Sequence, residues 1–177
     1  GGATVTYVHS LKPKVILESM QETGTTCMLG VPTLYALIRD DIERRILRTP
    51  KSPLKSNLLN TSKGVSLSVE RVLGKNIGRQ LFSRLHQEFG GQIRLFVSGG
   101  SALGEKLYDE FKVLGMPIYE GYGLTETAPV LTVNPFQRSR KGSAGKPLPG
   151  VEIGIFHPDK EGIGEIIAPL LPVPTLK

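Results

Sequence analysis

The chain has 177 residues, a formal net charge of +6 and one cysteine. One cysteine excludes a disulfide within the chain, and no apolar run reaches the roughly 18 residues of a membrane-spanning helix. The basic residues are scattered rather than interleaved with aromatic ones, and no DNA- or RNA-binding motif is present, so nucleic acid is not expected as a partner. A chain of this length can bury about 70% of its unfolded surface, as a globular enzyme domain does.

The N-terminal part alternates predicted strands with amphipathic helices. Residues 4–8 alternate between polar and apolar side chains, which predicts a strand, and residues 12–22 are predicted to form a helix with a proline in its first turn. Residues 25–29 are predicted to form a buried strand, in which Cys27 is expected to be an inert, buried thiol. A second helix is predicted from residue 32 to about residue 47, because its apolar side chains recur at helical spacing.

A loop and a further helix follow. Residues 49–63 are rich in Pro, Ser, Asn and Lys, a composition typical of a loop. Apolar side chains recur at helical spacing over residues 77–89, and two glycines end this predicted helix. His86 lies on the helix beside polar residues, so we expect its imidazole to face solvent. None of the three histidines has a partner at the spacing of a metal site or a catalytic triad.

The next segment predicts a βαβ unit. Residues 92–97 alternate and are β-prone, residues 104–114 carry apolar side chains at helical spacing, and residues 115–119 are predicted to form a short buried strand. Such a unit requires parallel strands and a right-handed crossover. The glycine-containing loops 98–102 and 120–127 then leave the carboxyl ends of neighbouring strands, the edge at which open α/β sheets bind ligands.

The C-terminal part has a different character, since Gly and Pro become frequent and short strands replace helices. Residues 151–156 and 164–167 are predicted to form a hairpin with residues 157–162 as its loop. We therefore expect an α/β fold, with a layered, parallel-rich sheet flanked by helices, over residues 1–141. The start of a β-rich subdomain is expected over residues 142–177.

The segment Glu120-Gly-Tyr-Gly-Leu-Thr-Glu-Thr127 carries the clearest chemical signal. Its glycines let the backbone approach a ligand closely, Tyr122 can stack on a flat ring, Thr125 can bind a phosphate oxygen and Glu126 can hold Mg²⁺. Together these features indicate a nucleotide and metal site. The alternative is a glycine-rich turn after a strand, in which Thr125 caps a helix and Glu126 is its first-turn acid.

Three motifs in this order resemble the AMP-forming acyl-CoA synthetases of the adenylate-forming superfamily. They are Ser98-Gly-Gly-Ser-Ala-Leu103, Glu120-Gly-Tyr-Gly-Leu-Thr-Glu-Thr127 and Gly145-Lys-Pro-Leu-Pro-Gly150, preceded by the similar junction Leu29-Gly-Val-Pro-Thr-Leu-Tyr35. The resemblance extends from about Thr4 to Ile167 and implies a truncated adenylate-forming N-terminal domain. Glu120 and the charged helix after residue 32 favour the long-chain fatty acid branch, the long-chain fatty acid–CoA ligases.

The resemblance implies an ATP-dependent, AMP-forming acid–thiol ligase. In the first step a fatty acid carboxylate attacks the α-phosphate of ATP, giving an acyl-adenylate and pyrophosphate. In the second step the thiolate of coenzyme A displaces AMP. The implied cofactors and substrates are therefore ATP or AMP, Mg²⁺, a fatty acid and coenzyme A.

The resemblance also implies site residues. Tyr122 would lie along one face of the adenine, while Thr125 would bind the α-phosphate and Glu126 would hold Mg²⁺, which makes these last two the catalytic candidates. The remaining nucleotide-binding candidates are glycines and small residues that bring backbone close to the adenine: Gly100, Ser101, Ala102, Gly121 and Gly123. Gly100 would also border the acyl tunnel. The family commonly has Ala-Pro where this chain has Ser101-Ala102, which puts the shape of that loop in doubt.

Several elements of the family pattern are not found in this sequence. They are the Ser/Thr/Gly-rich phosphate loop with its lysine, the Thr-Gly-Asp whose aspartate holds the ribose, and the C-terminal domain with the adenylation lysine. Gly24-Thr25-Thr26 does not replace the phosphate loop, and Lys146 is expected to be structural. We therefore expect a central slice of a larger enzyme, inactive on its own.

Two alternatives remain open from the sequence. One keeps the fold and changes the acceptor, as in a fatty acyl-AMP ligase, an aryl-CoA ligase or an adenylation domain that loads a carrier protein. The other is a non-catalytic binding module that uses its basic surface. We expect a cytoplasmic location with peripheral membrane contact, and self-association through sheet edges without neighbours.

Overall fold

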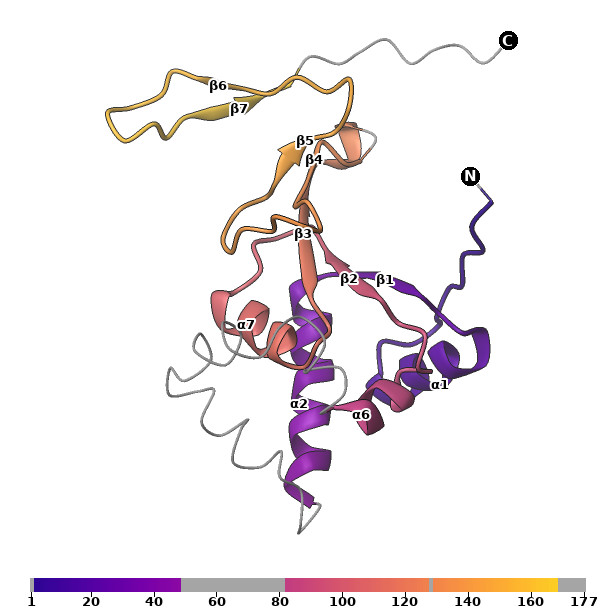
Figure 1. Cartoon of the computed structure of the whole chain (residues 1–177). Helices are drawn as coiled ribbons and strands as arrows, with labels where there is room; N and C mark the ends of the chain where they lie inside the picture. Colours follow the sequence, from indigo (N-terminus) through magenta and orange to yellow (C-terminus); the bar gives the residue numbers. More distant parts are fainter. Residues whose placement is uncertain (1, 49–81, 128, 169–177) are drawn as a thin grey trace.

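The computed structural model describes residues 2–48, 82–127 and 129–168 (Figure 1). The predicted loop at 49–63 and the first residues of the predicted helix at 77–89 lie outside the described residues. No helix within the described ranges is both long enough and apolar enough to cross a membrane.

A mixed sheet forms the centre of the fold. Among the described residues it has five strands in the order β1-β2-β3-β4-β5, namely β1 Cys27–Gly30, β2 Leu95–Ser98, β3 Ile118–Tyr122, β4 Thr132–Val133 and β5 Lys146–Pro147. The pairs β1–β2 and β2–β3 are parallel, and the pairs β3–β4 and β4–β5 are antiparallel. The predicted βαβ unit and the parallel-rich α/β fold are therefore confirmed. The predicted domain boundary at residue 141 stays a prediction.

The helices lie on one side of the parallel strands, as Figure 1 shows. They are α1 Pro13–Thr23, α2 Pro32–Arg48, α6 Ser83–Glu88 and α7 Glu105–Val113, and a 3₁₀ turn, η1, spans Thr125–Thr127. The predicted C-terminal hairpin is also present, with β6 Gly154–Phe156 pairing antiparallel with β7 Glu165–Ile167. Each helix or strand that was both predicted and observed starts or ends within a few residues of its predicted position, since local periodicity and turn residues define it, whereas the short strands β4 and β5 were not predicted.

Edge-to-face aromatic contacts join the helices to the sheet. The rings of Tyr35 on α2 and Phe111 on α7 both contact Phe96 on β2, with centroid separations of 5.5 and 5.6 Å. The Tyr35 hydroxyl lies 3.0 Å from the Met28 carbonyl oxygen and 2.8 Å from that of Val97. Its one proton can be donated to either carbonyl, so this buried side chain connects α2 to both β1 and β2.

Two N-terminal predictions are wrong. Residues 4–8 form no strand, and Tyr7 is 91% exposed, because alternation alone does not supply a neighbouring strand to pair with. Cys27 is exposed rather than buried. It lies on the face of β1 that points away from the helices, as does Leu29, which is 75% exposed.

The prediction for His86 is also wrong, since its side chain is only 3% exposed. Its Nε2 lies 3.0 Å from the carbonyl oxygen of Leu114, which can only accept a hydrogen bond, so Nε2 carries the proton and donates. The bond joins α6 to the end of α7. Polar neighbours in the sequence suggested exposure, but the helix turns this position toward α7.

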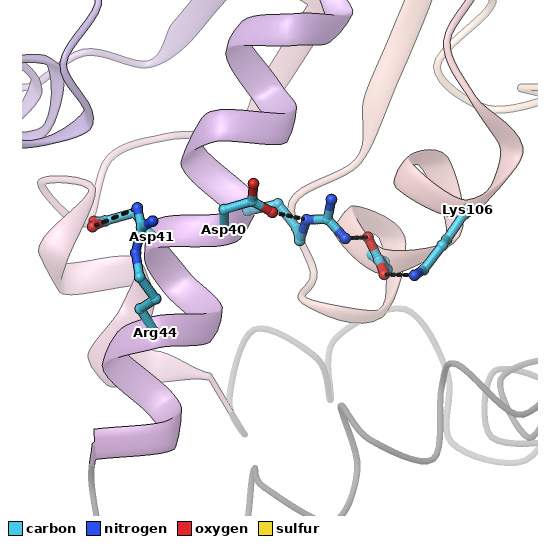
Figure 2. Close-up of polar contacts among 6 residues, drawn as sticks. Asp40, Asp41, Arg44 and Lys106 are labelled. Atoms are coloured by element: carbon cyan, nitrogen blue, oxygen red, sulfur yellow. Dashed lines mark hydrogen bonds and ion pairs between the residues drawn. The ribbon is translucent and has the colours of Figure 1, made fainter.

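An ion-pair network connects α2 with α7 (Figure 2). Arg39 lies 2.7 Å from the Asp40 carboxylate and 3.4 Å from that of Glu110, and Lys106 lies 3.8 Å from Glu110. The Glu110 side chain is only 11% exposed. Burial raises the pKa of Glu110 above its usual value of 4.5, and this effect exceeds the opposing attraction of Arg39 and Lys106.

The raised pKa of Glu110 predicts the sign of a pH effect. The folded state binds the proton more tightly than the unfolded state, so the contribution of Glu110 to stability is fully present below its unfolded pKa and is lost as pH rises through the folded pKa. We expect Glu110→Gln to remove this loss, so that the variant gains stability relative to the parent over a pH range that begins near the usual pKa of 4.5 and extends upward. Urea unfolding across this range measures the effect, with exposed Glu18→Gln as the control. A variant that loses stability relative to the parent as pH rises would contradict the prediction.

Candidate functional site

β1 and β2 end at a common level, and β3 runs two residues further to Tyr122. Gly30 of β1 is paired in register with Ser98 of β2, and Ser98 is paired with Glu120 of β3. The chain then leaves all three strands at one edge of the sheet, where the Gly99 N–H still donates to the Gly30 carbonyl at 3.1 Å. This is the edge at which the sequence predicted a ligand site.

The loop after β2 lies next to β3. A side chain at Gly99 would place its Cβ 3.5 Å from the Gly121 carbonyl oxygen, so the two backbones are in contact. Gly100 has φ +83°, a conformation that favours glycine, and a Cβ there would lie 3.6 Å from Val31. Ser101 and Ala102 are exposed. The structure therefore places the start of the loop, at Gly99, beside Gly121 of β3, and places Gly100 next to Val31.

The segment after β3 turns sharply into η1. The Thr127 hydroxyl makes the hydrogen bonds of this turn, accepting from the Leu124 N–H and donating to the Leu124 carbonyl, each at 2.9 Å. Thr125 and Glu126 lie within the turn with exposed side chains. The turn is thus closed by Thr127 rather than Thr125, and the two predicted catalytic side chains face outward, accessible to a ligand.

A pocket of about 320 Å³ lies against this turn. Its lining combines the end of β3 and the turn with the end of β7: Tyr122, Leu124, Glu126, Thr127, Leu131, Ile166, Ile167 and Ala168. Of the predicted site residues, the structure brings Tyr122 and Glu126 together here. Thr125, Gly121, Gly123 and the loop residues Gly100, Ser101 and Ala102 are not part of the lining.

The structure explains by packing why position 123 is a glycine, which the sequence did not show. A Cβ at this position would overlap the backbone of Pro129, in particular its carbonyl group. At Gly121 a Cβ would lie a tight 3.2 Å from the Thr132 carbonyl oxygen. The return of the chain toward β4 therefore needs these glycines, whether or not a nucleotide also approaches them.

Glu120 is a site residue to which the sequence analysis gave no role. Its side chain is only 8% exposed, and its Oε2 accepts a hydrogen bond of 2.9 Å from the Leu103 N–H. Its burial could have been expected from its position two residues after Ile118 in a strand. Side chains two apart in a strand point to the same face, and Ile118 is buried.

Glu126 is the candidate ligand for a metal ion at this site. Within the described residues no three His, Cys, Asp or Glu side chains lie close enough together to hold a metal ion. Glu126 offers a single exposed carboxylate beside the pocket. Because Mg²⁺ in nucleotide sites commonly takes one or two carboxylates, with substrate phosphates and water as its other ligands, one carboxylate fits such an ion.

Comparison with known proteins assigns this chain to a family. The family described as AMP-binding enzyme matches residues 1–168, and the chain belongs to it. The resemblance to AMP-forming acyl-CoA synthetases seen in the sequence is thereby confirmed at the level of the family.

Individual relatives agree with this assignment. The chain is 39% identical over 160 residues to the long-chain-fatty-acid–CoA ligase FadD15 of Mycobacterium bovis, covering 86% of this chain and 26% of that protein. Thus it spans about a quarter of the length of this curated relative.

Solved structures of similar fold include apo MatB from Rhodopseudomonas palustris, with a TM-score of 0.56, 26% identity, and coverage of 92% of this chain and 25% of MatB. The anthranilate CoA ligase AuaEII in complex with anthranoyl-AMP has a TM-score of 0.58 and 21% identity, covering 95% of this chain and 26% of AuaEII. At 21% identity, the similarity to AuaEII is evidence for a shared fold only.

The crowding at Gly123 predicts a loss of stability on substitution. We expect Gly123→Ala to lower the free energy of unfolding by about 1–3 kcal/mol, because the backbone of Pro129 would have to move. Gly104→Ala is the control for an added Cβ without a clash, since no atom lies within 4 Å of a Cβ there, and because Gly104 is the N-cap of α7 its cost should stay below about 1 kcal/mol. Urea unfolding measures both, and equal effects would show that the contact with Pro129 has no energetic weight.

Proposed function

We propose that this chain is the central part of a long-chain fatty acid–CoA ligase. The observation that carries the proposal is the meeting of Tyr122 and Glu126 at one pocket, on the sheet edge where the glycine-rich loop also begins. Family membership supports an AMP-forming ligase, and the long-chain relative supports a fatty acid as substrate.

The proposed reaction has two balanced steps. A carboxylate oxygen of the fatty acid bonds to the α-phosphorus of ATP as the bond to pyrophosphate breaks, which gives the acyl-adenylate. The coenzyme A thiolate then bonds to the acyl carbon, and AMP leaves with the electron pair of the broken C–O bond. Both steps develop charge at oxygen, so positioning and electrostatic stabilisation provide most of the rate enhancement.

Each proposed residue has one task in these steps. Tyr122 stacks on the adenine, and Gly100 to Ala102 border its other face. The Thr125 hydroxyl donates to an α-phosphate oxygen. When bound, Mg²⁺ neutralises phosphate charge, and Glu126 is the residue that would hold it. The exposure of Thr125 and Glu126 and the place of Glu126 in the pocket support these tasks.

We also propose that the chain of 177 residues has no ligase activity by itself. Its sequence has no Ser/Thr/Gly-rich phosphate loop with a lysine and no Thr-Gly-Asp to hold the ribose. For the acceptor we propose coenzyme A rather than a carrier protein, because the long-chain relative is described as a CoA ligase. We place the whole protein in the cytoplasm, where the exposed Arg138 and Arg140 give it a weak attraction to anionic membrane surfaces.

Replacement of Tyr122 tests the proposed function. In the whole protein, Tyr122→Ala should raise the KM for ATP by roughly 5- to 150-fold, the equivalent of losing about 1–3 kcal/mol of stacking. Tyr122→Phe keeps the ring and is the matched control, expected within about threefold of the parent. The measurement is ATP–pyrophosphate exchange with a long-chain fatty acid. Absence of fatty-acid-dependent exchange in the unsubstituted whole protein would refute the function, and exchange by the chain of 177 residues alone would refute its proposed inactivity.

The exposed face of the sheet leads to a proposal of self-association. β1 is the first strand in the order of the described sheet, Leu29 on it is 75% exposed, and Cys27 on the same face is also exposed. An unprotected strand with apolar side chains favours pairing with a second chain. Light scattering of the isolated chain should show a mass that grows with concentration, and Leu29→Lys should reduce this growth. A constant monomeric mass would contradict the proposal.

A further inference from the structure

One buried carboxylate links the two parts of the site. Glu120 lies in β3, two residues before Tyr122, and its Oε2 accepts the hydrogen bond of the Leu103 N–H at 2.9 Å. Leu103 directly follows the loop Gly99 to Ala102 and directly precedes Gly104, the N-cap of α7. The bond therefore fixes the far end of the loop to the strand that carries Tyr122.

The near end of the same loop is held separately. The Gly99 N–H donates to the Gly30 carbonyl at 3.1 Å, and the Gly99 backbone lies against Gly121. Between these two attachments Gly100, Ser101 and Ala102 are exposed. Because an exposed loop with glycines has few contacts to restrict it, its position relative to Tyr122 depends on its two ends. Loss of the hydrogen bond to Glu120 would release the end of the loop at Leu103.

A second observation concerns the remaining polar atoms at this place. Glu120 Oε1 and the Oγ of Ser98 are both buried, and neither has a hydrogen-bond partner among the described residues. Ser98 and Glu120 are register partners, so their side chains lie on the same face of the sheet. A buried polar atom without a partner costs stability. Packing alone therefore does not explain a carboxylate at this position. The hydrogen bond from the Leu103 N–H to Oε2 does explain it.

We propose that Glu120 is a positioning residue that holds the Gly99–Ala102 loop at a fixed distance from Tyr122 and so sets the width of the nucleotide site. The proposal rests on the proposed function, since it assumes that a nucleotide base lies between these two parts. Glu120 itself acts through Leu103 and needs no contact with substrate. What the position requires is an acceptor oxygen at the reach of a glutamate side chain, rather than a negative charge.

This requirement distinguishes Glu120→Gln from Glu120→Asp. Glutamine keeps an acceptor oxygen at the same reach without the charge, whereas aspartate keeps the charge and is one methylene shorter. In the whole protein we expect Glu120→Asp to raise the KM for ATP about tenfold with kcat changed by less than about threefold, and Glu120→Gln to leave both within about threefold. Glu152→Asp, at an exposed position, is the matched control.

Amide hydrogen exchange gives a readout that is independent of activity. Exchange at Leu103 should become about tenfold faster in Glu120→Asp and stay close to the parent rate in Glu120→Gln. The reverse order, with aspartate tolerated and glutamine not, would overturn the proposal in favour of a role for the charge. Equal KM values in all three proteins would also overturn it.

The exchange readout also separates the two proposals from each other. If the unsubstituted whole protein forms no acyl-adenylate, the proposed function fails, and exchange at Leu103 still reports whether Glu120 fixes the loop. Should Glu120→Asp not fold, as judged by circular dichroism, Glu120→Gln decides. An intact Leu103 bond together with a KM raised tenfold in that variant would overturn the proposal.

Discussion

The parallel register of β1, β2 and β3 is the constraint on which the rest of this structure depends. Gly30, Ser98 and Glu120 stand at the same level, so the loops that follow these strands leave from one edge. Contacts of Tyr35 beneath the sheet support this register, because its hydroxyl lies within hydrogen-bond distance of carbonyls of both β1 and β2 while its ring packs on Phe96. A shift of one residue would turn Phe96 out of the core and separate the loops.

The segment after β3 is needed for chain packing and is also proposed to bind the ligand. Gly123 is needed because the chain returns past it, and the backbone of Pro129 occupies the space that a side chain would take. The Thr127 hydroxyl closes that turn, which leaves Thr125 and Glu126 exposed. A motif with two glycines and two threonines therefore has a structural role in the turn, and the nucleotide-binding role of the same segment stays a proposal.

Elements defined by local signals could be predicted, and features that need a distant partner could not. The helix at 104–114 and the hairpin at 151–167 follow from periodicity and turn residues, and both are present. The strand expected at residues 4–8 failed because alternation gives no information about a neighbour. His86 was expected in solvent, and its burial comes from the carbonyl of Leu114, 28 residues away. Tyr122 and Glu126 of the pocket lining could be named as candidates from local motifs, whereas the contribution of β7 could not be predicted, because it comes from a segment distant in the sequence.

The sequence by itself determined the family, the βαβ unit and the residue types available for nucleotide chemistry, because these depend on short-range spacing along the chain. Only the tertiary structure decided which side chains meet. It brought Ile166 and Ile167 to the pocket beside Tyr122 and buried Glu120 against the Leu103 N–H, and it left the outer face of β1 exposed. The physical reason is that burial and hydrogen bonding between distant segments follow from how the strands pair and how the helices cover them, which no local pattern encodes.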